Sequence, residues 1–76
     1  MKEFINYLVS LIVDNPQDVE VSERILDEKS IQYIISANEK DIGKIIGKGG
    51  KIIQAIRNIV KVLAVKHDKQ VRIEVA

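Results

Sequence analysis

Apolar residues near the start of the chain recur at helical spacing. The i, i+3/i+4, i+7 pattern of an amphipathic helix is met by Phe4, Ile5, Leu8, Leu11 and Ile12. The pattern predicts a helix over residues 2–14, because the proline of Asp14-Asn15-Pro16 disfavours helical geometry in the residue before it. Val9 and Val13 widen its apolar arc to about 200°, beyond the usual single stripe. Either its own domain wraps this helix deeply, or its flank contacts another protein.

Two stretches with strand character follow. Residues 19–26 alternate only partly between apolar and polar side chains, which predicts an edge strand with an irregularity near Ser22-Glu23. Residues 31–37 are richer in β-branched and aromatic side chains, so we expect them to form the central strand of a sheet. The polar residues 27–30 predict a turn that joins the two strands as a hairpin.

The helical pattern then returns in two segments. Asn38 is a favourable N-cap, and Asp41 three positions later is typical of a capping-box-like arrangement at the start of a short helix, about 39–46. The longest helix is expected over about 50–66, with a buried stripe formed by Ile52, Ile56, Ile59, Val60 and Leu63. Val62 and Val65 fall outside that stripe.

The chain ends in a strongly alternating stretch. Val71, Ile73 and Val75 alternate with polar residues and predict a last strand, and His67 is expected in the turn before it, without a metal or catalytic role. The two-helix connection between the second and third strands is long enough for a right-handed crossover, which makes those strands parallel neighbours. We expect an α+β fold of order α-β-β-α-α-β, with a three-stranded mixed sheet covered on one face by three helices.

Composition limits the size and setting of this fold. Seventy-six residues, of which 46% are apolar, predict one small domain over residues 1–76. The chain has no cysteine, so neither a disulfide nor a thiolate metal site can stabilise it. It has no run of 18 apolar residues and no signal-peptide pattern, so we expect a cytoplasmic protein with no membrane partner.

Charge is divided unevenly along the chain. Residues 1–42 hold four basic and nine acidic residues, a net charge of −5. Residues 43–72 hold eight basic residues and only Asp68 as an acid, a net charge of +7. Such a division marks the second half as the electrostatic surface for a polyanion. The alternative is a solvated surface with unevenly distributed lysines.

The basic half contains a glycine-rich loop between two predicted helices. The Walker pattern fails because the position five after Gly43 is Lys48, and the dinucleotide fingerprint fails because its third glycine would fall at Ile52. What fits is G-x-x-G from Gly47 to Gly50, within the run I-I-G-K-G-G-K-I-I-x-x-I. A tight glycine turn directly before a helix start favours binding of a phosphate.

This run resembles the K-homology (KH) domain, whose loop clamps the backbone of about four nucleotides. The element order is similar to the bacterial, type II KH arrangement, and the whole chain resembles the KhpA-type small RNA-binding proteins of bacteria. The resemblance implies RNA binding, pairing with a second KH-containing protein, and roles in RNA regulation, RNA chaperoning and cell shape. The preference for single-stranded RNA over single-stranded DNA rests on this resemblance alone.

Within this reading the candidate site has three parts. Backbone amides around the loop and the following helix start bind phosphates, and exposed apolar edges of Ile46 and Ile53 give bases a dry surface. The edge of a neighbouring strand reads the bases, while Ile45, Ile52 and Ile56 belong to the core. The predicted RNA-binding residues are Lys44, Ile46, Gly47, Lys48, Gly49, Gly50, Lys51, Ile53 and Arg57.

Two further classes of function compete with RNA binding. A protein-interaction module or heterodimer subunit with a vestigial loop would not need the three lysines around the loop. An enzyme is disfavoured, because no nucleophile–base pair, carboxylate pair or metal cluster can be assembled there, and we expect no cofactor. The surplus apolar residues, Val9, Val13, Val62 and Val65, predict a homodimer or a heterodimer with another KH protein.

Overall fold

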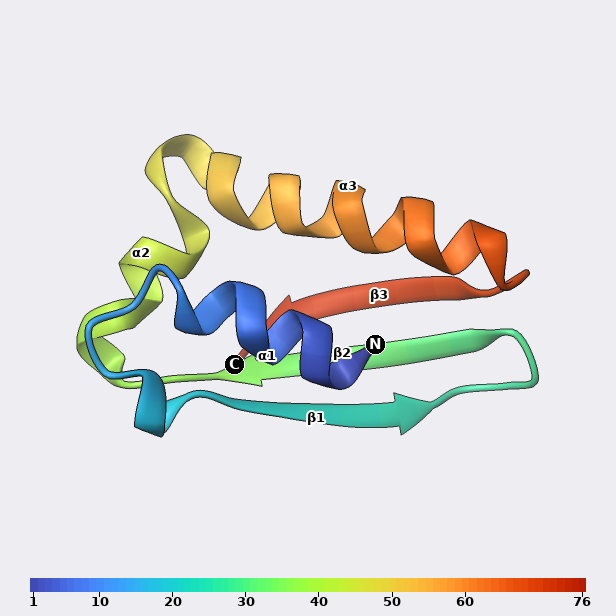
Figure 1. Ribbon diagram of the computed structural model, residues 1–76, viewed down its shortest axis with the longest axis horizontal. Helices are drawn as coiled ribbons and strands as arrows, with labels where there is room; N and C mark the ends of the chain where they lie inside the picture. Colours follow the sequence, from blue (N-terminus) through green and yellow to red (C-terminus); the bar gives the residue numbers. More distant parts are fainter.

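The computed structural model describes residues 1–76 and places three helices on one face of a three-stranded sheet (Figure 1). The helices and strands in chain order are α1 (Lys2–Ser10), β1 (Glu20–Ile25), β2 (Ser30–Ser36), α2 (Ile42–Ile46), α3 (Lys51–Lys66) and β3 (Gln70–Val75). Short 3-10 turns precede three of them, at Pro16–Asp18, Glu39–Asp41 and Lys48–Gly50. The predicted α+β class and the order α-β-β-α-α-β are confirmed.

The sheet has the order β1-β2-β3, with β2 in the centre as predicted. β1 pairs antiparallel with β2, and β3 pairs parallel with β2, so the crossover through α2 and α3 is confirmed. The irregularity expected near Ser22-Glu23 is wrong, because the register of β1 against β2 is unbroken. The polar residue that interrupts the alternation is Glu23, which lies opposite Tyr33; burial and a hydrogen bond to Glu23 raise the pKa of Tyr33 to about 12.

One hydrophobic core lies between the helices and the sheet. α1 contributes Val9, which is fully buried, and Val13 packs against the core from beyond the end of that helix. The predicted wide arc is therefore covered only in part, because Leu11 and Ile12, beyond the helix end, are 64% and 37% exposed. The core consists of Ile5, Val9, Val21, Tyr33, Ile35, Ile45, Ile53, Ile56, Val60 and Ile73.

Several of the predicted elements differ from the structure in detail. α1 ends at Ser10 instead of residue 14, and the chain turns at Leu11 and Ile12. The cause lies beyond the turn, where the amides of Asp14 and Asn15 bind a side chain of another element instead of continuing the helix. Both bounds of β1 and both bounds of β2 shift by one residue from the predicted ranges, and the helix expected from residue 39 begins at Ile42, after the 3-10 turn Glu39–Asp41.

The core stripe of α3 also differs from the predicted one. Its buried residues are Ile53, Ile56, Val60 and Ala64, whereas Ile52 and Ile59 are exposed. α3 carries more apolar residues than the sheet can cover. The stripe around Val60 packs against the sheet, and the neighbouring stripe with Ile52 and Ile59 stays exposed. As predicted, Val62 and Val65 lie outside the core stripe.

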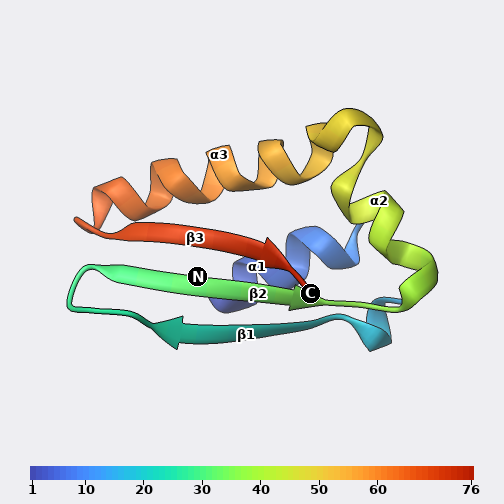
Figure 2. The ribbon, with the colours of Figure 1, turned by 180° about the vertical axis from the view of Figure 1, so that it is seen from behind.

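The two faces of the sheet are unequal. α1 contacts β1 and α3 contacts β3 on the covered face, and Figure 2 shows the opposite face without any helix over it. α3 runs along β3, so the groove between them begins beside the glycine loop and follows the outer edge of the sheet. None of the helices has both the length and the apolar character that crossing a bilayer requires.

Candidate nucleic-acid interface

The loop between α2 and α3 turns through three glycines with positive φ. Gly47 has φ 77° and ψ 171°, a conformation that is essentially restricted to glycine. Gly49 and Gly50 have φ 64° and 77° with ψ 20° and 14°, which is the left-handed helical region. The loop is therefore a tight backbone turn, and only its first glycine is confined to a region that other residues cannot reach.

The loop delivers the chain directly into the first turn of α3. Gly50 is the N-cap residue, and no side chain caps the helix or places an acid in its first turn. The first amides of a helix have no carbonyl partner within it, and the helix dipole makes this end positive. Lys48 and Lys51 are exposed on either side of the glycine pair. These features together make the loop suitable for an anion.

Beside the loop lies a groove between α3 and β3, which we call the α3–β3 groove. It encloses about 790 Å³, and a smaller hollow that contains Gly49, Gly50 and Lys51 adjoins it. The two share Gln54, Arg57 and Asn58, so the groove continues from the loop along the helix. The lining of the α3–β3 groove is Ser30, Gln54, Arg57, Asn58, Lys61, Val65, Lys69, Gln70, Val71, Arg72, Ile73 and Glu74.

β3 presents one side of its backbone to this groove. The N–H groups of Gln70 and Ala76 donate to carbonyls of the β2 side at 2.6 and 2.8 Å. In a parallel ladder alternate residues bond to the same neighbouring strand, so the even-numbered residues of β3 bond to β2. Val71, Ile73 and Val75 therefore point their N–H and C=O groups toward the free edge of β3, and of these Val71 and Ile73 line the groove.

Arg57 closes part of this free edge. Its guanidinium donates from Nε and Nη2 to the Ile73 carbonyl oxygen, at 3.2 and 3.1 Å. This contact ties α3 to the strand and fixes the guanidinium in the groove, where the remaining N–H groups can donate to a ligand. Arg57 was predicted as an RNA-binding residue from charge and position, and the structure places it where the groove meets the smaller hollow.

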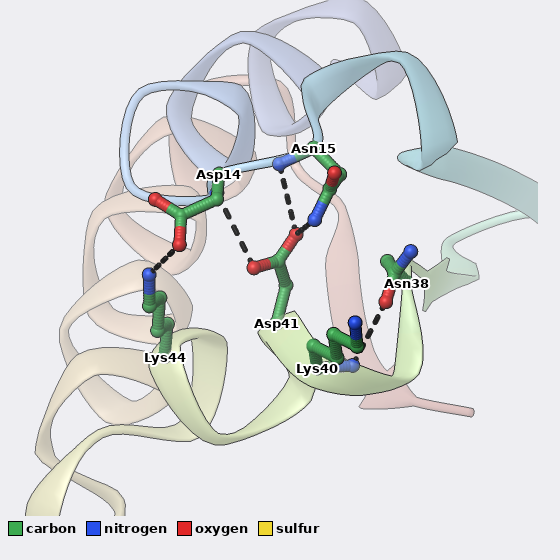
Figure 3. Close-up of polar contacts among 6 residues, drawn as sticks. All are labelled: Asp14, Asn15, Asn38, Lys40, Asp41 and Lys44. Carbon is green, nitrogen blue, oxygen red and sulfur yellow. Dashed lines mark hydrogen bonds and ion pairs between the residues drawn. The ribbon is translucent and has the colours of Figure 1, made fainter.

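A buried carboxylate positions the segment that leads into α2. Asp41 is only 1% exposed, and it accepts hydrogen bonds from the amides of Asp14 and Asn15 and from the Asn15 side chain, at 3.0–3.3 Å (Figure 3). Burial raises the pKa of Asp41, but these hydrogen bonds and the nearby Lys44 outweigh it, so the pKa stays below its usual range. Asn38 caps the turn as predicted, through the Lys40 amide. The capping role predicted for Asp41 is wrong, because its carboxylate faces the α1–β1 connection.

Lys44 lies on the same side of α2 as Asp41. Its ammonium forms an ion pair with Asp14, shown in Figure 3, and that contact raises the pKa of Lys44 although burial opposes the shift. Lys44 was predicted to surround the phosphate site with Lys48 and Lys51. The structure instead directs it toward Asp14 in the α1–β1 connection, whose carboxylate already balances its charge.

The isoleucines around the loop are placed differently from the prediction. Ile46 is exposed, as expected, and Ile45 and Ile56 are buried in the core. Ile53 is only 6% exposed, so the expected dry edge at this residue is wrong, and Ile52 is 38% exposed although it was assigned to the core. The two neighbours exchange roles because the glycine turn sets the rotation of α3, and the pattern of apolar residues around positions 52 and 53 fits either rotation.

Several groove residues were not among the predicted site residues. Gln54, Asn58 and Lys61 line the groove, and the sequence alone had suggested no role for them. Their spacing with Arg57 and Val65 was a usable signal, because residues at i, i+3/i+4, i+7 and i+11 lie on one helix face. The crossover topology adds that this face borders the free edge of β3. Lys69 and Arg72 line the groove only because the crossover places β3 beside α3, which the sequence of β3 alone does not reveal.

Comparisons with known proteins agree with this geometry. The family model described as KhpA/KhpB, KH domain matches residues 2–75. A protein of Clostridium perfringens named RNA-binding protein KhpA is 43% identical over 75 residues, covering 99% of both chains. Proteins of the same name from Listeria monocytogenes and Caldanaerobacter subterraneus are 39% and 43% identical, covering 99% of this chain and 97% and 99% of theirs.

Those relatives come from bacteria, and KH domains of this family are non-catalytic, in agreement with the prediction that the chain is not an enzyme. A comparison with solved structures found no match. The family match over residues 2–75 and the connection through two helices between the parallel strands β2 and β3 lead to one conclusion. The chain belongs to the KhpA/KhpB family of KH domains.

Proposed function

We propose that this chain is a single KH domain over residues 1–76 that binds single-stranded RNA without catalysis. The observation that carries the proposal is the turn Gly47–Gly50, which opens onto an uncapped helix start beside a basic groove. The relatives at 39–43% identity are named as RNA-binding proteins, which supports RNA over other polyanions.

The first part of the mechanism is a phosphate clamp. The amides of Gly49 and of the first turn of α3 beyond Lys51 donate to the phosphates of about four nucleotides, and Lys48 and Lys51 add positive charge. The amides of Gly50 and Lys51 bond instead to the carbonyl oxygens of Gly47 and Lys48, which holds the turn in shape. Because Lys44 is already paired with Asp14, it contributes to the general positive field of this half of the chain more than to a direct contact. Phosphate contacts fix the register of the strand but carry no sequence information.

The second part of the mechanism is base contact in the α3–β3 groove. The free N–H and C=O groups of β3 offer both a donor and an acceptor to base edges, and Arg57, Gln54 and Asn58 add side-chain groups. Ile46 supplies an exposed apolar edge, whereas Ile53 is too deeply buried for that role. No aromatic side chain lines the groove, so base stacking, about 1–3 kcal/mol per base in other proteins, contributes little.

A second proposal concerns pairing of the domain. The exposed apolar residues Ile52, Ile59 and Val62 recur at i, i+7 and i+10, and we call this set the α3 flank. With about 100° per residue, the α3 flank and the groove-lining residues lie on opposite sides of the core stripe. A second copy, or another KH protein, that covers the α3 flank would leave both loops free. Two clamps would then bind one strand with useful avidity.

The cellular role follows from the ligand. An RNA ligand would be met in the cytoplasm, the location that we propose. Participation in RNA regulation, RNA chaperoning and cell shape stays a prediction from the family resemblance. The alternative, an interaction module with a vestigial loop, is disfavoured because Lys48 and Lys51 are exposed beside the loop and neither forms an ion pair with a carboxylate.

Fluorescence polarisation with short labelled oligonucleotides tests the proposal. A single-stranded RNA and a DNA of the same sequence are titrated at two salt concentrations. We expect RNA binding that weakens with salt, because phosphates are neutralised in the complex. A chain that binds neither nucleic acid at low salt would contradict the proposal, and equal affinity for both would remove the preference for RNA.

A further inference from the structure

The end of the α3–β3 groove far from the glycine loop carries its own basic and apolar side chains. Lys61 and Val65 reach it from α3, and Lys69 and Val71 from the start of β3. We call these four residues the distal subsite. The groove as a whole contains four basic side chains and a single acid, Glu74, and two of the four basic side chains belong to the distal subsite.

The two lysines of the distal subsite remain available to an anion. Neither forms an ion pair with a carboxylate, in contrast to Lys29 and Lys44, which pair with Asp68 and Asp14. The Lys69 ammonium donates to the Glu28 carbonyl oxygen at 2.6 Å. That contact holds the side chain in place and leaves two of its three N–H donors for a ligand.

An apolar surface accompanies these cations. Val65 is 66% exposed although it lies in the groove, and Val71 beside it is half-buried. A phosphate bound by Lys61 and Lys69 would bring its nucleotide next to this surface, where a base could cover the valines. The exposed Val65 can therefore contact a base within the nucleic-acid groove, and it does not belong to the α3 flank.

The distance from the loop fits a longer strand than the loop alone clamps. Lys61 follows Lys51 by ten residues of α3, which corresponds to about 15 Å along the helix axis. A stacked strand advances about 3.4 Å per phosphate, so this length corresponds to roughly four nucleotide steps. The distal subsite thus begins where a clamp of about four nucleotides ends.

We infer that the bound RNA continues along the α3–β3 groove from the loop clamp to the distal subsite, where Lys61 and Lys69 bind additional phosphates over Val65 and Val71. The inference rests on the proposed RNA-binding function and specifies it further. A single domain then binds a strand longer than the roughly four nucleotides that the loop clamps.

Length-dependent binding tests this inference. Labelled oligouridylates of about four and about eight nucleotides are titrated by polarisation against the parent chain and the double variant Lys61→Gln/Lys69→Gln. The longer oligomer can place its clamped nucleotides in about five registers on a four-nucleotide clamp, so it binds more tightly than the shorter one even without a distal subsite. The double variant should keep this statistical advantage in affinity. We expect the variant to lose affinity for the longer oligomer by roughly tenfold and to bind the shorter one as the parent does.

The control is Lys2→Gln/Lys40→Gln, which removes the same charge from exposed positions outside the groove. Circular dichroism establishes that each variant is folded. The salt slope of the parent should be steeper for the longer oligomer by about 0.7 per additional phosphate, and the groove variant should lose that difference. A groove variant that binds the longer oligomer as tightly as the control overturns the inference alone. A parent that binds neither oligomer overturns the proposed function and the inference with it.

Discussion

Ile52 packs directly against the backbone of Gly47. A Cβ at position 47 would overlap the Ile52 side chain, with Cβ of Ile52 at 2.8 Å and its backbone nitrogen at 2.9 Å. Gly47 is therefore required twice, by this contact and by its glycine-only backbone conformation. Nothing lies within 4 Å of a Cβ added at Gly49. The first glycine of the loop is structural, and position 49 has room for a side chain but keeps a left-handed φ of 64° that only residues such as asparagine and aspartate tolerate.

The first prediction compares these two glycines. Gly47→Ala should lower the free energy of unfolding by more than about 3 kcal/mol, because backbone strain and the overlap with Ile52 add. Gly49→Asn should cost less than about 1 kcal/mol, since asparagine tolerates the left-handed region. Urea unfolding of the two variants and the parent measures the difference. Equal loss in both variants would show that the Gly47–Ile52 contact does not hold the loop.

The second prediction tests the phosphate clamp itself. Lys48→Asp/Gly49→Asp should abolish RNA binding, because it puts two carboxylates where a phosphate must lie. The fold should remain, since Lys48 and Gly49 are exposed and aspartate tolerates the backbone of Gly49. Polarisation measures binding, and thermal melting followed by circular dichroism measures the fold.

A matched control carries the same change of net charge away from the loop. Lys2→Asp/Gln17→Asp changes two exposed residues outside the groove. This control should weaken binding only modestly, through the long-range field, and its deficit should shrink at higher salt. The clamp hypothesis is wrong if the loop variant binds RNA as tightly as this control does.

The third prediction is a salt dependence for the clamp. If about two to four phosphates are neutralised, log affinity should fall with log salt with a slope of about −1.4 to −2.8 for a single strand. Lys51→Gln should flatten the slope by about 0.7, whereas Lys44→Gln should change it less because Asp14 already balances that charge. An affinity that does not depend on salt would indicate apolar contacts or a different partner.

Much of this site follows from the sequence, and the remainder depends on tertiary contacts. Alternation and helical spacing predicted the order of the elements, and G-x-x-G predicted the loop. Local pattern did not reveal that Asp41 reaches residues 26 and 27 positions away, nor which of Ile52 and Ile53 faces the core. The first depends on a contact distant in sequence, and the second on a helix rotation set by three positive-φ glycines.

The fourth prediction follows from the buried carboxylate. The folded-state pKa of Asp41 lies below the unfolded value of about 3.9. Its hydrogen bonds therefore stabilise the fold above that value, and the stabilisation is lost as the pH falls through the folded-state pKa. Asp41→Asn should lower the melting temperature at neutral pH and reduce the further loss in acid. Melting temperatures of both proteins at neutral pH and at about pH 3 measure this, and parallel acid profiles would contradict it.

The last prediction concerns association through the α3 flank. Val62 is 62% exposed on that flank, and Val65, three residues later, lines the groove. Val62→Glu should abolish dimerisation, because it places a charge in the apolar interface, and should leave the affinity of one domain for a short RNA unchanged. Val65→Glu should leave dimerisation unchanged and weaken RNA binding, because its carboxylate faces the phosphates.

Light scattering at increasing concentration measures the dimerisation of each variant, and polarisation measures the affinity of each variant for the short RNA. The same substitution at two exposed valines of one helix keeps charge and helix propensity equal, so the difference reports only the face that each residue occupies. Val9→Glu is unsuitable for this test, because Val9 is fully buried and its substitution would unfold the chain. A parent that stays monomeric to the highest concentration contradicts the homodimer, and the α3 flank would then be available to a different KH protein. If Val62→Glu weakens RNA binding as much as Val65→Glu does, the two faces of α3 are not separate, and pairing through the flank would block the groove.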